Sequence, residues 1–90
     1  MEYILFIHNN ASSQASADEW DGFFTKARAR GMFVGGSEIA SGQMLGAQLL
    51  PSITNSVGGF MLFEADDKSA LLQLLESHPV LAHGGTMELC

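Results

Sequence analysis

Two segments of the chain carry apolar side chains at both odd and even positions, Tyr3–Ile7 and Gly58–Ala65. Aromatic and branched residues dominate them, which is typical of β-strands. A strand that is apolar on both sides is covered on both sides. The pattern therefore predicts two central strands of a sheet, each with two buried faces.

A helix is predicted over residues 17–30. Its apolar positions recur at spacings of three and four, the period of one helix face: Trp20, Phe23, Phe24 and Ala27. Ser16 and Glu19 have the spacing of a capping box at the start. Basic residues crowd the last turns, and Gly31 is a good terminator.

A second helix is predicted over residues 67–77, with a buried stripe made of Ala70, Leu71, Leu74 and Leu75. Asp66 is the expected N-cap, because its carboxyl group can accept from the backbone N–H of Lys68 or Ser69. Pro79 is expected to end the helix, since it pushes His78 away from helical geometry. At such a helix end a charged His78 would favour the helix dipole.

Two further strands are expected in less regular segments. Met32–Val34 begins one, which Gly35–Gly36 interrupts as a bulge or close approach before it resumes at Ser37–Ala40. Gly84–Gly85 turns the chain into the other, Thr86–Leu89. Residues 41–57 stay ambiguous: they could extend a strand, form an edge hairpin or remain a loop.

The resulting order, β-α-β followed by β-α-β, predicts an α+β fold of ferredoxin-like βαββαβ type over a single domain, residues 1–90. Both helices then cover one face of an antiparallel sheet. The other face is apolar as well, and an open apolar face is a liability. The simplest cover is a second copy, so we expect a homodimer through the sheet face.

Composition narrows the possible partners. Ten acidic residues against four basic ones give a net charge of −6, which disfavours nucleic acid and anionic membranes. No signal peptide or membrane-spanning stretch is visible, so a cytoplasmic protein is expected. The single cysteine, Cys90, cannot form an internal disulfide.

Several segments together resemble the YCII-related (DGPF) family across nearly the whole chain. The later half carries Val57-Gly-Gly-Phe-Met-Leu-Phe-Glu-Ala-Asp and His78-Pro-Val-Leu-Ala-His-Gly-Gly-Thr-Met-Glu-Leu. The earlier half adds Glu19-Trp20 and Arg30-Gly-Met-Phe-Val-Gly-Gly-Ser-Glu-Ile. The resemblance implies a dimeric α+β barrel. It implies little about activity, although some relatives of this barrel class act on small organic molecules.

Two departures from the family pattern concern its signature loop and its end. Ser52-Ile-Thr-Asn-Ser stands where the DGPF signature is expected, and the last strand ends in Glu88-Leu-Cys without the usual arginine. Both weaken the transfer of a binding site through that loop.

Three residues are candidates for acid–base chemistry. His8 ends the first strand and shares its parity with Ile4 and Phe6; it is either a base at a pocket mouth or a strand-end histidine bonded to solvent or backbone. His83 could face His8 if the first and last strands are neighbours. Glu38 is the only acidic residue of the second strand, and is either a pocket carboxyl group or a solvated edge charge.

Other site chemistries find no support in the sequence. The histidine spacing fits no metal motif, so no metal is expected. The paired glycines match no phosphate-binding loop, so no cofactor is expected. Trp20 with Phe23 and Phe24 could line a cofactor pocket, but at helical spacing they favour core packing. Cys90 has no activating base nearby in sequence.

These observations lead to two hypotheses about function. In the first, a small YCII-like homodimer binds or transforms a small organic molecule in a cleft near the sheet, with histidine as acid or base. In the second, the chain is a non-catalytic homodimeric binding or accessory module, since no catalytic set is assembled.

Overall fold

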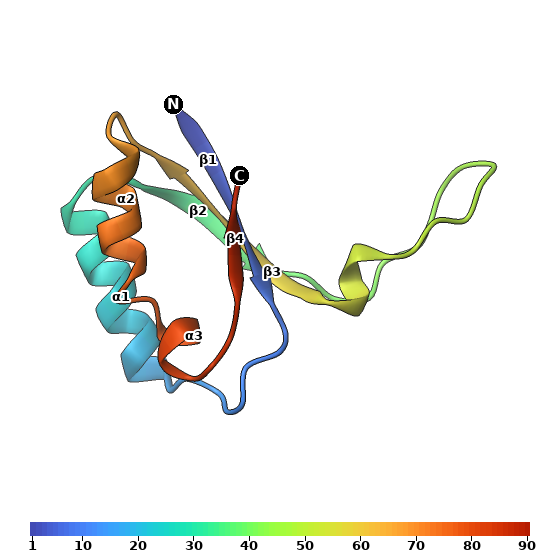
Figure 1. Cartoon of the computed structure of the whole chain (residues 1–90), viewed down its shortest axis with the longest axis horizontal. Helices are drawn as coiled ribbons and strands as arrows, with labels where there is room; N and C mark the ends of the chain where they lie inside the picture. Colours follow the sequence, from blue (N-terminus) through green and yellow to red (C-terminus); the bar gives the residue numbers. More distant parts are fainter.

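A computed structural model describes all 90 residues. In chain order the elements are β1 (Glu2–His8), α1 (Ala17–Ala29), β2 (Phe33–Glu38), the 3-10 turn η1 (Ile53–Asn55), β3 (Val57–Glu64), α2 (Lys68–Leu75), α3 (Pro79–Ala82) and β4 (Met87–Leu89). The elements follow a βαββαβ order, with a short additional helix, α3, between α2 and the last strand. Figure 1 shows their arrangement.

The strands form one antiparallel sheet in the order β2-β3-β1-β4. The two segments with apolar residues at both parities are the central strands, as predicted. β1 and β4 are neighbours, with Phe6 opposite Glu88. The α+β ferredoxin-like fold expected from the sequence is confirmed.

The core lies between the sheet and the helices, on the side shown to the left in Figure 1. Leu5 of β1 pairs with Met61 of β3, and Tyr3 pairs with Phe63, so these side chains share the helix-facing side. Phe23 of α1 and Leu71 of α2 pack against them. This packing uses only one face of the sheet.

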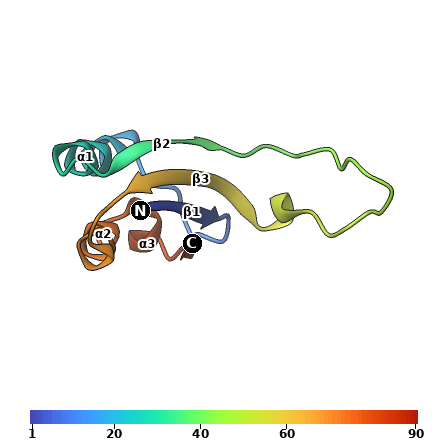
Figure 2. The ribbon, with the colours of Figure 1, turned by 90° about the horizontal axis from the view of Figure 1, so that it is seen from above.

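The opposite sheet face has no helix over it (Figure 2). Ile4 pairs with Leu62, and Phe6 pairs with Phe60, at the parity opposite to the core positions. Val34 of the edge strand β2 is also exposed. We call this surface the open face; its five apolar residues are Ile4, Val34, Phe6, Phe60 and Leu62.

Local signals at the helix starts are mostly confirmed. Ser16 and Glu19 form the complete capping box of α1. The N-cap of α2 is Asp67, however, and the prediction of Asp66 is wrong by one residue. Asp67 has the extended backbone that a cap needs, and its Oδ1 accepts from the N–H of Ser69. The chain uses Asp66 for the turn out of β3.

His78 and Pro79 begin a helix instead of only ending one. Pro79 is the first residue of α3, where its missing N–H costs nothing. His78 is the N-cap, and its Nδ1 accepts from the N–H of Val80. His78 also follows the end of α2, as expected, but the expectation that its side chain is charged is wrong, because burial lowers its pKa.

Of the segment left ambiguous in the sequence, residues 41–56 form no strand and Val57 begins β3. β2 ends at Glu38 rather than continuing to Ala40, and residues 39–56 leave the sheet as a long excursion before β3 begins. We call residues 39–56 the arm; it reaches far to one side of the body in both views (Figures 1 and 2). Only the short turn η1 interrupts it. No helix in the chain is long and apolar enough to cross a bilayer.

The predicted glycine bulge is present in β2. The two adjacent glycines, Gly35 and Gly36, have different surroundings, and this difference can be tested by substitution. The register shifts between Phe33 and Gly35. A Cβ on Gly36 would collide with the carbonyl oxygen of Phe60, whereas one on Gly35 would meet nothing within 4 Å. We expect Gly36→Ala to lower the free energy of unfolding by about 1–3 kcal/mol, because backbone cannot move aside as a side chain can.

Gly35→Ala is the matched control for this prediction. Urea unfolding of both variants measures the difference. Equal stability of the two would contradict the close approach of β2 to β3.

Candidate functional site

A cleft of about 390 Å³ opens between α1 and the sheet. This volume falls in the range of small-molecule pockets. The cleft lies where β1 and β2 end and β3 begins. Its walls are mainly aromatic, aliphatic and glycine residues: Ile7, Trp20, Phe24, Gly36, Ser37, Glu38, Gly58, Gly59, Phe60 and Met61.

The aromatic wall comes from α1. Trp20 and Phe24 are one helical turn apart, and their rings stack with centroids 5.8 Å apart. Phe23, between them, turns into the core instead. The sequence favoured core packing for all three aromatic residues, but the structure divides them between the core and the cleft wall.

Bare backbone forms part of the opposite wall. Gly58 and Gly59 follow Val57, the first residue of β3. A Cβ on Gly59 would approach the carbonyl oxygen of Ser37 to 3.3 Å. The tight strand pairing thus explains why glycine stands there. Bare backbone also lets a bound molecule approach the strand closely.

Glu38 is the only titratable residue that lines the cleft. It pairs with Gly59 in the sheet register, so its side chain lies on the helix-facing side of β2. Neither a hydrogen bond nor an ion pair holds its carboxyl group to another residue, and the Ser37 hydroxyl donates to its backbone carbonyl only. The carboxyl group is therefore available to a bound molecule.

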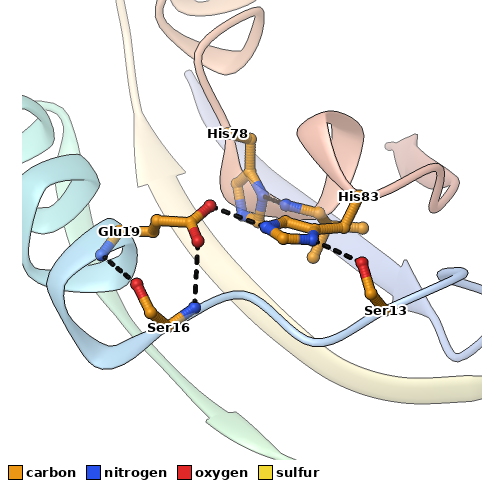
Figure 3. A network of polar contacts seen from close by, with 6 residues as sticks. Ser13, Ser16, Glu19, His78 and His83 are labelled. Atoms are coloured by element: carbon orange, nitrogen blue, oxygen red, sulfur yellow. Dashed lines mark hydrogen bonds and ion pairs between the residues drawn. The ribbon is translucent and has the colours of Figure 1, made fainter.

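A polar network joins the start of α1 to the end of α3 (Figure 3). The Nε2 of His83 lies 2.7 Å from Oε2 of Glu19, and its Nδ1 lies 2.7 Å from the hydroxyl of Ser13. The second carboxyl oxygen of Glu19 accepts from the backbone N–H of Ser16. One carboxyl group thus serves both the capping box and the histidine.

The charges of this network fix the tautomer of His83. The Ser16 N–H bond, followed by the His83 bond, lowers the pKa of Glu19 below its usual value. An ionised carboxylate only accepts, so the neutral ring of His83 carries its proton on Nε2, and its Nδ1 accepts from the hydroxyl of Ser13. Both ring nitrogens are occupied, which makes the network a clamp between α1, α3 and the loop before α1.

His78 lies behind the aromatic wall of the cleft. Its side chain is buried, at 1% exposure, and the ring meets Trp20 edge-on with centroids 5.0 Å apart. Since Nδ1 accepts from Val80, the proton is on Nε2, which lies 3.4 Å from the sulfur of Met61. Desolvation lowers the pKa of His78 to about 4, so the ring is neutral near pH 7.

The three residues selected from the sequence are not brought together. Glu38 lines the cleft, and His83 is held by Glu19 and Ser13. His8 belongs to the open face, where its Nε2 lies 3.8 Å from the carboxyl group of Glu88. The expected approach of His83 to His8 does not occur, because β4 places Glu88 there and His83 precedes the turn into β4.

Sequence reasoning missed the tertiary contacts of this region. Nothing in the sequence connects Ser13 or His83 to Glu19, for which the sequence indicates a capping role alone. One signal is present in the sequence: a capping box occupies only one of the two carboxyl oxygens of Glu19, so the other oxygen is left for a second partner. No group of three or more histidine, cysteine, aspartate or glutamate side chains is placed to hold a metal ion.

No protein-family model matches the chain, and no curated protein matches it. Among solved structures it is similar to the 5-chloro-2-hydroxyhydroquinone dehydrochlorinase TftG from Burkholderia phenoliruptrix, in complex with 2,5-dihydroxybenzoquinone. The TM-score is 0.54 at 14% sequence identity, and the match covers 100% of this chain and 91% of that chain. The likeness supports the ferredoxin-like α+β fold, while the YCII-related family stays a resemblance.

The buried neutral His78 predicts an acid-sensitive fold. The unfolded residue has the ordinary pKa of 6.5 and the folded one about 4, so the unfolded state binds more protons below pH 6.5. Stability must therefore fall as the pH is lowered, by about 2 kcal/mol between pH 7 and pH 5. Urea unfolding at the two pH values measures this loss.

His78→Asn keeps a capping oxygen but removes the titrating ring, so it should flatten the dependence over this window. His8→Gln, on the open face, is the control and should keep the full slope. A slope that is unchanged in His78→Asn would refute this role for His78. The comparison stops at pH 5 so that the Glu19 carboxyl group, whose pKa is lowered from 4.5, keeps its contacts in both measurements.

Proposed function

We propose that this protein binds a small aromatic molecule bearing a hydroxyl group, in the cleft between α1 and the sheet. The single observation that carries the proposal is the unpartnered carboxyl group of Glu38 in an otherwise largely apolar cleft. A ring hydroxyl can donate to this group. Pockets of this kind gain affinity from apolar contact and orientation from a few polar groups.

The walls favour a flat ring over a flexible chain. The stacked rings of Trp20 and Phe24 offer an aromatic surface, and Gly58 and Gly59 leave bare backbone on the sheet side. Offset or edge contacts with aromatic side chains add to the burial of a ring. His78 supports this wall from behind, since it holds the edge-on contact with Trp20.

Glu38 is the acid–base residue of this proposal. Its carboxyl group can take the proton of a bound hydroxyl and return it. His83 acts at a distance, through the clamp that holds the start of α1, and His8 belongs to the open face. In this proposal the acid–base residue is therefore Glu38, and not one of the histidines expected from the sequence.

The solved structure of similar fold gives support on the class of ligand. TftG is described in complex with 2,5-dihydroxybenzoquinone, a hydroxylated ring, and acts on a chlorinated hydroxyhydroquinone according to its name. A hydroxylated ring fits the chemistry of Glu38 and the aromatic wall. With one titratable group in the cleft, binding without turnover is the second candidate function, and assay of product formation separates the two.

The open face supports a homodimer. Its two exposed apolar residues, Leu62 and Val34, need a cover, and a second copy offers an identical apolar face. We infer that two copies pack sheet to sheet. The clefts then lie on the outer, helix-covered sides and stay accessible.

Catechol is a suitable probe, because the only tryptophan of the chain, Trp20, lines the cleft and reports binding by its fluorescence. Saturable quenching is expected with catechol and much weaker quenching with its dimethyl ether. Replacing the charged acceptor in Glu38→Gln should weaken catechol binding roughly tenfold.

Glu88→Gln, on the open face, is the matched control and should bind catechol as the unmodified chain does. Equal affinity of Glu38→Gln and the unmodified chain would rule out the role of Glu38. Non-saturable quenching by both compounds would rule out the cleft as a binding site for this class.

The dimer is tested by light scattering on the unmodified chain at micromolar concentration, with twice the 9.6 kDa chain mass expected. Leu62→Lys places a charge at the centre of the open face and should give the single-chain mass. Leu72→Lys, on the outer surface of α2, should leave the dimer intact. A single-chain mass for the unmodified protein would contradict the proposal.

A further inference from the structure

The arm differs from the rest of the chain in its charge. Residues 39–63, which include the whole arm and most of β3, contain no Asp, Glu, Lys, Arg or His. The rest of the chain carries a net charge of −6. Two copies repel each other over most of their surface, but not along this segment.

The arm also exposes large apolar side chains. Residues 40–51 are exposed without exception, and Leu45 and Leu49 reach 86% and 85%. Met44, Leu50 and Ile53 are exposed as well. Leucine side chains this exposed on a projecting segment mark an interaction surface, since soluble chains rarely leave such clusters in water.

The arm leaves the sheet at one end of the two strands that carry part of the open face. The arm joins the end of β2 to the start of β3, and these two strands carry Val34 and Leu62 of the open face. Figures 1 and 2 show the arm running beyond the sheet. Of the ten exposed large apolar residues in the chain, seven belong to the arm or the open face.

We propose that the arm of each copy packs against a second copy of this chain, as the outer part of the homodimer interface; this rests on the sheet-to-sheet dimer proposed above. A second copy seated on the open face lies beside the root of the arm. The arm has no basic residue to attract an anionic lipid surface, and the acidic body would be repelled by one. A two-fold arrangement places both arms in equivalent contacts.

The test compares two sets of leucines of similar chemistry. The triple variant Leu45→Ser, Leu49→Ser and Leu50→Ser removes the apolar tip of the arm. The control variant Leu72→Ser and Leu81→Ser removes leucines that are 46% and 43% exposed on α2 and α3. Sedimentation equilibrium of the full chain gives the dimer dissociation constant of each.

We expect the arm variant to dissociate about 100-fold more readily than the unmodified chain, because apolar burial drives association, and the control to stay within about threefold. The arm contributes no residue to the buried core, so its variant should keep the helical circular dichroism of a folded chain.

The outcomes separate the arm from the sheet interface. If Leu62→Lys is monomeric while the arm variant associates like the unmodified chain, the sheet dimer stands and the arm proposal is overturned. Equal weakening by the control variant also overturns it. A monomeric unmodified chain overturns the arm proposal together with the dimer.

Discussion

The pairing of β1 with β3 is the constraint on which the other features depend. Leu5 opposite Met61 and Tyr3 opposite Phe63 set one face toward the helices, and the intervening pairs, such as Ile4 with Leu62, are then forced to the other. A shift by one residue would exchange the two faces. Because both sets are apolar, the register creates a covered core and an open apolar face at once.

The same pairing positions the cleft. Gly59 lies opposite Ile7 on β1 and opposite Glu38 on β2, so the ends of three strands meet beside the first turns of α1. The clamp of Glu19, His83 and Ser13 holds that end of α1, and buried His78 holds Trp20. The site is therefore built by the packing of elements distant in sequence. Its titratable side chains differ in their surroundings: Glu38 lines the cleft, Glu19 and His83 are paired, and His78 is buried and neutral.

Much of the fold could be read from local pattern, and the errors have local causes. Periodicity located β1, β3, α1 and α2, because burial of a whole face acts on every residue of an element. The cap of α2 was misplaced between two adjacent aspartates, whose chemistry is identical and whose backbone geometry alone differs. His78 was misjudged because a proline that ends one helix can equally begin the next.

Residue type and spacing along the chain are enough to predict the βαββαβ order, the two apolar faces of the central strands and the acidic charge. Which side chains meet depends on the tertiary packing. It placed Glu38 in the cleft, His8 beside Glu88 and His83 between Glu19 and Ser13, and it projected residues 39–56 away from the body. Contacts of this kind depend on the strand register and on the angle at which α1 and α3 cross the sheet. Neither of these is encoded in the spacing of residues within one element.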